Sequence, residues 1–300
     1  MGRFRPLAGF LLAALLVTSC GRFGRKAASA ATGPRDVVIS QLYNEIIWAL
    51  GAQQSVVAVD WSSTYPPAIK SVATIGYHRA LSAESILSLR PTVVIEDGNV
   101  GPPQVLQQLH ELGVPTKTFT HTNDTIPDLE ALIREMGAFF HKEARAEELC
   151  QRLDRQMAAS LEAVKQYHDS PRVAIIHYGQ ASNVYLTVTG HGGGDAAGAG
   201  QMIAWAGGRM AIGGRSGMQR LLSPEIVAEA NPDVILMTAF GYDKLGSMAA
   251  AKTLPGVAET SAARHNRIYR VTEHQLMYLN PDTGANVLTI AKLIHQPPSQ

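Results

Sequence analysis

Short apolar runs alternate with longer segments of helical periodicity along most of this chain. The runs 37–39, 56–59 and 92–95 have the length and the β-branched content of buried strands. The segments that follow them place apolar residues at helical spacing and end at glycine or proline, as helices do. The second half repeats this alternation, with strands predicted at 173–176, 234–237 and 267–271 and helices at 199–205 and 223–230. Strands and helices that alternate over short connections predict parallel sheets covered by helices on both faces.

One uninterrupted helical segment lies between the two halves. Residues 142–168 contain neither proline nor glycine, and at about 1.5 Å per residue they would form a rod of roughly 40 Å. We therefore expect an α/β fold of two Rossmann-like lobes with parallel sheets, joined by one long linker helix and with the ligand in the cleft between them. The expected boundaries are 35–141 for the first lobe, 142–169 for the helix, 170–296 for the second lobe and 297–300 for a tail. An ordinary surface helix is the alternative.

The N-terminus has the features of an export signal. Arg3 and Arg5 precede an apolar run over residues 7–17, which is too short for a membrane span of ~20 residues. The residues Val-Thr-Ser before Cys20 resemble the bacterial lipobox, in which the cysteine is lipidated and becomes the mature N-terminus. We expect a signal peptide at 1–19, a lipidated tether at 20–34, and a protein outside the cytoplasm, in the periplasm or on the outer face of the cytoplasmic membrane. A plain secretory signal is the alternative.

The charge argues against a nucleic acid as a partner, and the cysteine content leaves no pair for a disulfide within the mature chain once Cys20 is lipidated. Removal of residues 1–19 takes away two arginines and leaves 24 basic and 25 acidic side chains, a formal charge of −1. The sequence contains no run of basic residues of the kind that binds nucleic acids. No second apolar stretch is long enough to cross a membrane, so we expect membrane contact through the lipid anchor only. Cys150 is the only other cysteine, and its apolar neighbours predict a buried, unreactive thiol.

A carboxylate recurs at the same place in both halves. Ser82, Glu84 and Pro91 are matched 141 residues later by Ser223, Glu225 and Pro232. Each glutamate falls in the first turn of a predicted helix, where the helix dipole favours a negative charge. Helix capping alone would explain one such residue, whereas the two-fold placement indicates a shared function.

The segment from Gly76 to Glu84 carries the most specific chemistry. Tyr77, His78 and Arg79 lie on a loop directly before a helix that Ser82 can cap. A tyrosinate is a suitable ligand for ferric iron, although a free phenol has a pKa of about 10, so that the metal and a nearby guanidinium must favour the anion. In extended backbone, Tyr77 and Arg79 would point to the same side.

This segment resembles the heme-binding members of the substrate-binding proteins of bacterial ABC importers, the helical-hinge class that also binds ferric siderophores and cobalamin. Those members carry Gly-Tyr-x-Arg-x-Leu before the capped helix, as this chain does at residues 76–81. The resemblance implies that Tyr77 is the axial ligand of ferric heme b and that Arg79 supports it. It further implies that Arg220 pairs with a propionate and that Glu84 and Glu225 dock onto arginines of the membrane permease.

The opposite side of the iron is less defined by the sequence. His177 and Tyr178 follow the strand predicted at 173–176, at the end of a parallel sheet where ligands bind. Either of them, or neither, could be a second axial ligand. Trp61 and Tyr65 could cover the macrocycle, or they could pack locally.

Other chemistries match the sequence less well. The run His191-Gly-Gly-Gly is similar to an oxyanion-hole loop, but the chain has no Gly-x-Ser-x-Gly pentapeptide and no P-loop. We expect a protein that is not an enzyme, binds ferric heme in the cell envelope and delivers it to an inner-membrane ABC permease with its ATPase. The nearer alternative is a ferric siderophore or cobalamin as ligand. The remote alternative is an envelope hydrolase that uses His177, His191 or Asp195.

Overall fold

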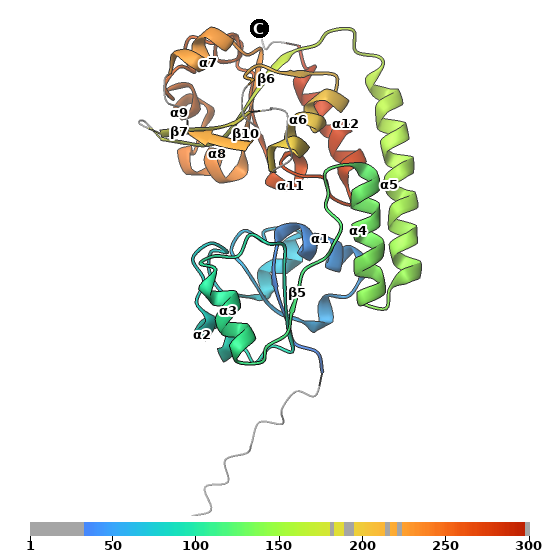
Figure 1. Ribbon diagram of the computed structural model, residues 1–300. Helices are drawn as coiled ribbons and strands as arrows, with labels where there is room; N and C mark the ends of the chain where they lie inside the picture. Colours follow the sequence, from blue (N-terminus) through green and yellow to red (C-terminus); the bar gives the residue numbers. More distant parts are fainter. Residues whose placement is uncertain (1–32, 181–182, 189–194, 214–216, 221–223, 298–300) are drawn as a thin grey trace, which may run out of the picture. The chain divides into compact units, whose positions relative to one another are not determined.

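The computed structural model describes residues 33–180, 183–188, 195–213, 217–220 and 224–297 (Figure 1). The signal peptide, most of the predicted tether and Cys20 lie outside these residues. The first sheet has the order β3-β2-β1-β4-β5, and all of its neighbouring strands are parallel. Its strands are β1 (Asp36–Ile39), β2 (Val56–Val59), β3 (Ala73–Thr74), β4 (Val93–Glu96) and β5 (Thr116–Lys117).

Helices follow the strands of the first sheet, and the last of them leads out of the sheet. They are α1 (Gln41–Leu50), α2 (Ala83–Ser88), α3 (Gln104–Glu111) and α4 (Ile126–Phe139), with the 3₁₀ turns η1 (Gln53–Ser55) and η2 (Pro67–Ser71). Ser40 caps α1 by accepting a hydrogen bond from the Tyr43 N–H, and Gly51 ends this helix at a φ of 72°. Ser82 caps α2 through the Ser85 N–H, as the sequence predicted.

The second sheet has the order β11-β10-β6-β7-β9, with β8 paired to β6. Its parallel part consists of β6 (Arg172–Gln180), β8 (Arg209–Met210), β10 (Val234–Thr238) and β11 (Ile268–Val271). The strands β7 (Asn183–Val188) and β9 (Gly217–Arg220) extend the sheet in antiparallel pairing. The predicted two-lobe α/β fold is thus confirmed, and the antiparallel extension is a feature that periodicity did not indicate.

The second sheet is also covered by helices. They are α6 (Asp195–Trp205), α7 (Glu225–Ala230), α8 (Ala239–Leu245), α9 (Met248–Lys252), α10 (Ser261–Arg264), α11 (Glu273–Leu276) and α12 (Thr283–Ile294). Two of them begin at other residues than we expected. The helix predicted from residue 199 begins at Asp195, and the helix predicted from residue 223 begins at Glu225 after Pro224.

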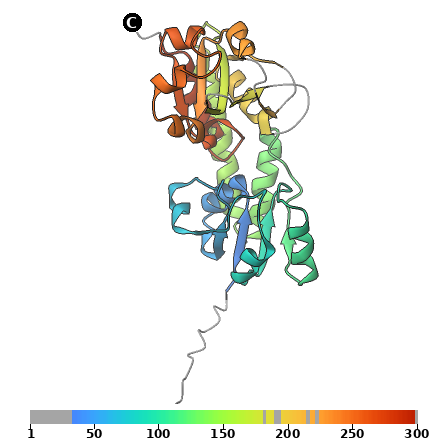
Figure 2. The same ribbon diagram turned by 90° about the vertical axis from the view of Figure 1, so that its left-hand side faces the viewer.

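The long helix α5 (Glu143–Val164) lies against α4 and α12 (Figures 1 and 2). It is a few residues shorter than the predicted helix, because the chain leaves helical geometry after Lys165. Its approach to α12 is close: the Ser160 hydroxyl donates to the Gly284 carbonyl at 2.6 Å. A Cβ atom on Gly284 would lie 2.6 Å from the backbone of Gln156 and Met157, so this contact requires glycine.

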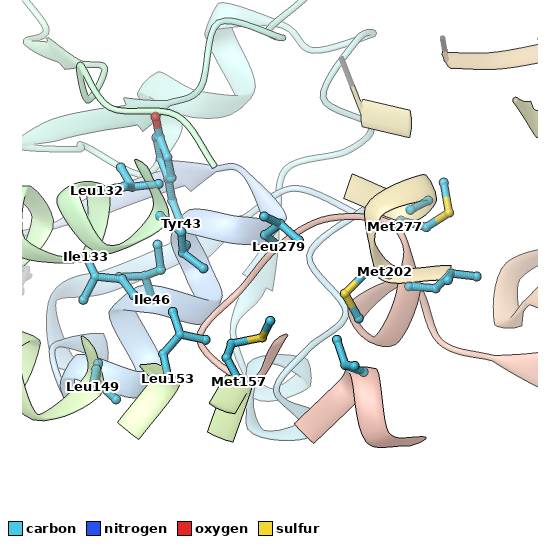
Figure 3. Packing of buried hydrophobic residues seen from close by; sticks show 14 of the residues in the cluster. Tyr43, Ile46, Leu132, Ile133, Leu149, Leu153, Met157, Met202, Met277 and Leu279 are labelled. Atoms are coloured by element: carbon cyan, nitrogen blue, oxygen red, sulfur yellow. The ribbon is translucent and has the colours of Figure 1, made fainter. Parts of the chain in front are cut away.

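The largest apolar cluster includes residues from both sheets and from α5 (Figure 3). From α5, Leu149, Leu153 and Met157 are buried in it, whereas Leu161 is 39 % exposed. Cys150 is buried in the same cluster, as predicted, and burial raises the pKa of its thiol to about 11. The cluster extends from helices of the first lobe, along α5, to helices of the second lobe. The side chains labelled in Figure 3 are Tyr43, Ile46, Leu132, Ile133, Leu149, Leu153, Met157, Met202, Met277 and Leu279.

The internal repeat extends to the backbone. Helices α2 and α7 are followed by Arg90 and Asn231, which are 141 residues apart and have positive φ values of 49° and 40°. The Arg35 guanidinium donates to the Leu89 carbonyl at 2.7 Å, and the Arg172 guanidinium donates to the Ala230 carbonyl at 3.2 Å. Each glutamate-bearing helix is therefore held at its C-terminal end by an arginine at the start of its own lobe's first strand: Arg35 directly precedes β1, and Arg172 is the first residue of β6.

None of the helices in the described part of the chain combines the length and the apolar character that a membrane span requires.

Candidate functional site

The loop that carries Tyr77 is a turn held from two sides. Gly76 has a φ of 109°, which side-chain-bearing residues rarely adopt, and the Ala80 N–H donates to the Tyr77 carbonyl at 2.8 Å. Gly101 holds the turn by two backbone hydrogen bonds. Its N–H donates to the His78 carbonyl at 2.9 Å, and its carbonyl accepts from the Leu81 N–H at 3.0 Å. The expectation of extended backbone over residues 77–79 is therefore wrong.

The Tyr77 side chain is accessible. It is 45 % exposed, and its ring lies 4.4 Å from the His78 ring at an interplanar angle of 59°. A tyrosine that is fixed by its backbone and supported by a neighbouring ring, yet open on its other side, is available to a large flat ligand.

A cavity of about 330 Å³ lies at the carboxyl edge of the first sheet. Ser40 follows β1, Asp60 follows β2, Asp97 follows β4, and all three line the cavity. This is the edge at which open α/β sheets bind ligands. His78 and Arg79 also line it, whereas Tyr77 is not among its lining residues. The placement of the Tyr77 and Arg79 side chains on the same side stays a prediction.

Asp60 lies behind the Tyr77 turn and was missed from the sequence. It is fully buried, accepts hydrogen bonds from the Ser62 N–H at 3.0 Å and the Ser63 hydroxyl at 2.7 Å, and lies 3.6 Å from Nδ1 of His78. Burial raises the pKa of this carboxyl, but the nearby His78 ring and hydrogen bonds from Ser62 and Ser63 outweigh that effect and hold the pKa below its usual value. A buried carboxylate therefore faces the His78 ring, which lies beside Tyr77.

His177 and Tyr178 lie within β6, which continues to Gln180, so the prediction that they follow the strand is wrong. His177 comes one residue after the last parallel pair with β10, where the pairing with β7 is irregular. Its Nδ1 is 3.1 Å from the Thr238 hydroxyl, its ring stacks at 5.6 Å on Phe240, and burial lowers its pKa. Because Nδ1 has this partner, any bond from His177 to a metal would have to use Nε2. The structure therefore describes His177 as a packed residue at a sheet edge suited to ligands.

The other predicted site residues are placed less fully. The backbones of Tyr178 and Arg220 belong to β6 and β9, and their side chains lie outside the description. Glu84 and Glu225 are exposed in the first turns of α2 and α7. His191 lies outside the described residues.

A buried polar cluster joins α1 to α11, and no sequence pattern indicated it. The Glu45 carboxylate lies 2.7 Å from Nδ1 of His274 and accepts hydrogen bonds from Tyr278 and, at 2.7 Å, from Gln41. Tyr65 stacks on the His274 ring at 3.7 Å, so its role is local packing rather than an open aromatic surface. Glu45 and His274 are 229 residues apart, which is why periodicity within one helix could not relate them.

The comparisons with known proteins agree with this fold. A family model for periplasmic binding proteins matches residues 37–274, well over half of the chain. The chain belongs to the periplasmic binding protein family, whose members are substrate-binding components of ABC transporters.

Solved structures and curated relatives differ in the ligand they name. The periplasmic heme-binding protein RhuT from Roseiflexus sp. RS-1 is 32 % identical, with a TM-score of 0.77 over 88 % of this chain and 98 % of its own. The periplasmic heme-binding protein BhuT in complex with two hemes is 30 % identical, with a TM-score of 0.75 over 87 % of this chain and 97 % of its own. The vitamin B12-binding protein of Vibrio campbellii is 26 % identical over 54 % of this chain. That match spans only 58 % of the curated relative.

Proposed function

We propose that this periplasmic binding protein captures ferric heme and delivers it to an ABC permease with its ATPase. The observation that carries the proposal is the exposed Tyr77 phenol on a turn that Gly76 and Gly101 hold in place, at the carboxyl edge of the first sheet. The similarity to structures named as heme-binding proteins, at 30 % and 32 % identity, supports the same ligand.

The chemistry of this site suits ferric heme as cargo. A phenolate oxygen is an anionic ligand that ferric iron prefers, and the exposed position of Tyr77 admits a macrocycle. Arg79 lines the cavity beside the turn, so we assign it to support of the bound ligand by its charge. In the second lobe, Arg220 would pair with a propionate, and His177 or Tyr178 remains a candidate for the opposite side of the iron.

Delivery would use the two repeated glutamates. Glu84 and Glu225 are exposed in the first turns of equivalent helices, each held at its other end by an arginine. Docking at two equivalent points suits a permease that receives both lobes. Replacement of both glutamates with alanine should abolish uptake and leave hemin affinity intact; a parallel loss of affinity would contradict the docking role. Lipidation of Cys20 would hold the protein at the membrane.

Nothing in this mechanism makes or breaks a covalent bond, so we assign the protein no enzymatic activity. The second candidate ligand is a cobalamin, because a vitamin B12-binding protein is among the curated relatives. A corrinoid already carries its own axial ligands and would not depend on the Tyr77 phenol.

A hemin titration of wild-type protein, Tyr77→Phe and Tyr77→Ala tests the proposal. We expect saturable binding by the wild type with a ferric tyrosinate spectrum. Both variants should lose that spectrum and bind at least roughly tenfold more weakly, a loss of about 1.4 kcal/mol or more. Tyr167→Phe is the matched control, because its ring stacks on His295 at 4.0 Å and its loss removes a phenol elsewhere.

Two results would contradict heme ligation by Tyr77. An unchanged spectrum in both Tyr77 variants would place the iron on another residue. Saturable binding of cyanocobalamin, with no specific binding of hemin, would establish the cobalamin alternative.

A further inference from the structure

A groove lies on the surface of the first lobe between α2 and α3, which pack side by side (Figure 1). It has a volume of about 630 Å³. Its walls come from one face of each helix, because Glu84 and Leu87 are three residues apart on α2 and Gln108 and Glu111 are three apart on α3. Leu112, which directly follows α3, completes the lining. The groove therefore includes Glu84 of α2 and extends to α3. The internal repeat does not indicate a role for α3.

The lining combines an apolar floor with acidic rims. Leu87 is partly buried, and Leu112 is 63 % exposed, which is a large exposure for a leucine. Glu84 and Glu111 lie at opposite walls, and no lysine, arginine or histidine lines the groove within the described part of the chain. A ligand for this surface would carry a positive charge next to an apolar side chain.

The two carboxylates differ in their surroundings. Glu111 accepts a hydrogen bond from Gln107 Nε2 at 2.9 Å, which orients it along α3. Glu84 forms neither an ion pair nor a side-chain hydrogen bond with the residues described. Both are exposed, so a guanidinium entering the groove could pair with either one and shield the apolar floor from water.

The groove is stiff at its base. The Arg35 guanidinium holds the C-terminal end of α2 through the Leu89 carbonyl at 2.7 Å, and Ile86 and Leu109 anchor the two helices in one buried cluster. A preformed surface loses little conformational entropy when a partner binds, which favours a docking role over an accidental hollow.

We propose that this groove is the first-lobe half of the docking interface, and that it receives a segment of the permease in which an arginine is flanked by an apolar side chain. Glu111 and Leu112 then contribute to docking together with Glu84. This inference rests on the proposed delivery function, which it deepens by naming the partner's chemistry and two further contact residues.

The test uses wild-type protein and the variants Glu111→Gln, Leu112→Ser and Glu84→Ala with the permease–ATPase complex in lipid nanodiscs. The concentration of binding protein that gives half-maximal stimulation of ATP hydrolysis is measured without and with hemin. We expect Glu111→Gln and Leu112→Ser each to raise this concentration about three- to tenfold. Glu111→Gln should also weaken its dependence on salt, because fewer charges then pair across the interface.

Matched controls come from α5, which does not line the groove. Glu148→Gln removes an exposed carboxylate, and Leu161→Ser removes a partly exposed leucine. Both should leave the half-maximal concentration unchanged. Hemin affinity and thermal unfolding of all variants should equal those of the wild type, since every substituted side chain is exposed.

Separate outcomes overturn the groove and the heme proposal. If Glu84→Ala abolishes stimulation while Glu111→Gln and Leu112→Ser stay within twofold of the wild type, docking is confined to the tip of α2 and the groove is excluded. If wild-type protein sediments as a dimer that Leu112→Ser dissociates, the groove faces a second copy of this chain and the inference is wrong. If stimulation follows the groove variants but hemin neither binds nor alters it, the docking surface stands and the proposed ligand fails. If the wild type stimulates no hydrolysis, delivery and the groove fail together.

Discussion

The buried pair Glu45–His274 is the contact whose loss should most weaken the folded protein. Glu45 comes from α1 beside the first sheet and His274 from α11 beside the second, and their side chains are 2 % and 8 % exposed. His274→Phe would keep a ring to stack on Tyr65 at 3.7 Å while removing the nitrogen that faces the carboxylate. The change therefore isolates the pairing from the packing.

The expected magnitude follows from this burial. A hydrogen bond to a buried charged group contributes about 1.5–3 kcal/mol, because its loss leaves the charge desolvated and less well paired. Gln41 and Tyr278 still donate to Glu45, so we expect a loss within this range, about 2 kcal/mol. At an unfolding entropy of about 2.1 cal/mol/K per residue, a unit the size of residues 34–300 should then melt roughly 4 °C lower.

Urea unfolding followed by circular dichroism, with calorimetry for the melting temperature, measures this loss. The double variant Glu45→Gln/His274→Phe should be more stable than His274→Phe, because it no longer buries an unpaired carboxylate. Glu148→Gln is the control, since it breaks an exposed pair with Arg145 and should change little. A cost below about 1 kcal/mol for His274→Phe would refute the reasoning, because the pair would then contribute no more than an exposed one.

Two further predictions concern α5. Gly284→Ala should destabilise the protein by about 1–3 kcal/mol, because its Cβ would lie 2.6 Å from the backbone of Gln156 and Met157. Gly213 has open space around it, so the control Gly213→Ala should leave the free energy of unfolding unchanged in the same urea titration. Burial raises the pKa of the Cys150 thiol from 9.0 to about 11, so folding favours the protonated form; the stability that this contributes is complete below pH 9 and is lost as the pH rises towards 11. A Cys150→Ala variant should lack that part of the alkaline decline, and an identical decline in both proteins would contradict the assignment.

The strands and the central helix could be predicted because their signals are local. The runs at 37–39, 56–59 and 234–237 are apolar on both faces, as central strands of a covered parallel sheet must be, and all three are strands. The apolar residues of α5 fall on one face and are buried down to Met157. Helical spacing is a property of the segment itself, so no tertiary information was needed.

The polar parts of the structure could not be predicted in this way. Asp60 and His78 are neighbours because Gly76 and Gly101 fold the chain into a turn, and extended backbone was the wrong guess for that turn. The contact between Glu45 and His274 depends on how two distant helices pack. Polar contacts of this kind leave no periodic pattern in the sequence, because each depends on a single residue from each of two segments.

The repeat itself shows where sequence and local structure diverge. The offset of 141 residues that relates Glu84 to Glu225 also places Gly217 opposite Gly76 and Arg220 opposite Arg79, while Met218 stands opposite Tyr77. In the first half this segment is a turn closed by Ala80, whereas in the second half residues 217–220 form β9 and pair with β7. The second sheet offers an antiparallel strand to pair with and the first sheet does not, so related segments adopt different backbones. The arginine and the glutamate of this segment therefore occur in both lobes, whereas the position of Tyr77 carries a phenol only in the first lobe. A ligand bound through Tyr77 would be held asymmetrically, by the lobe whose turn is fixed in advance.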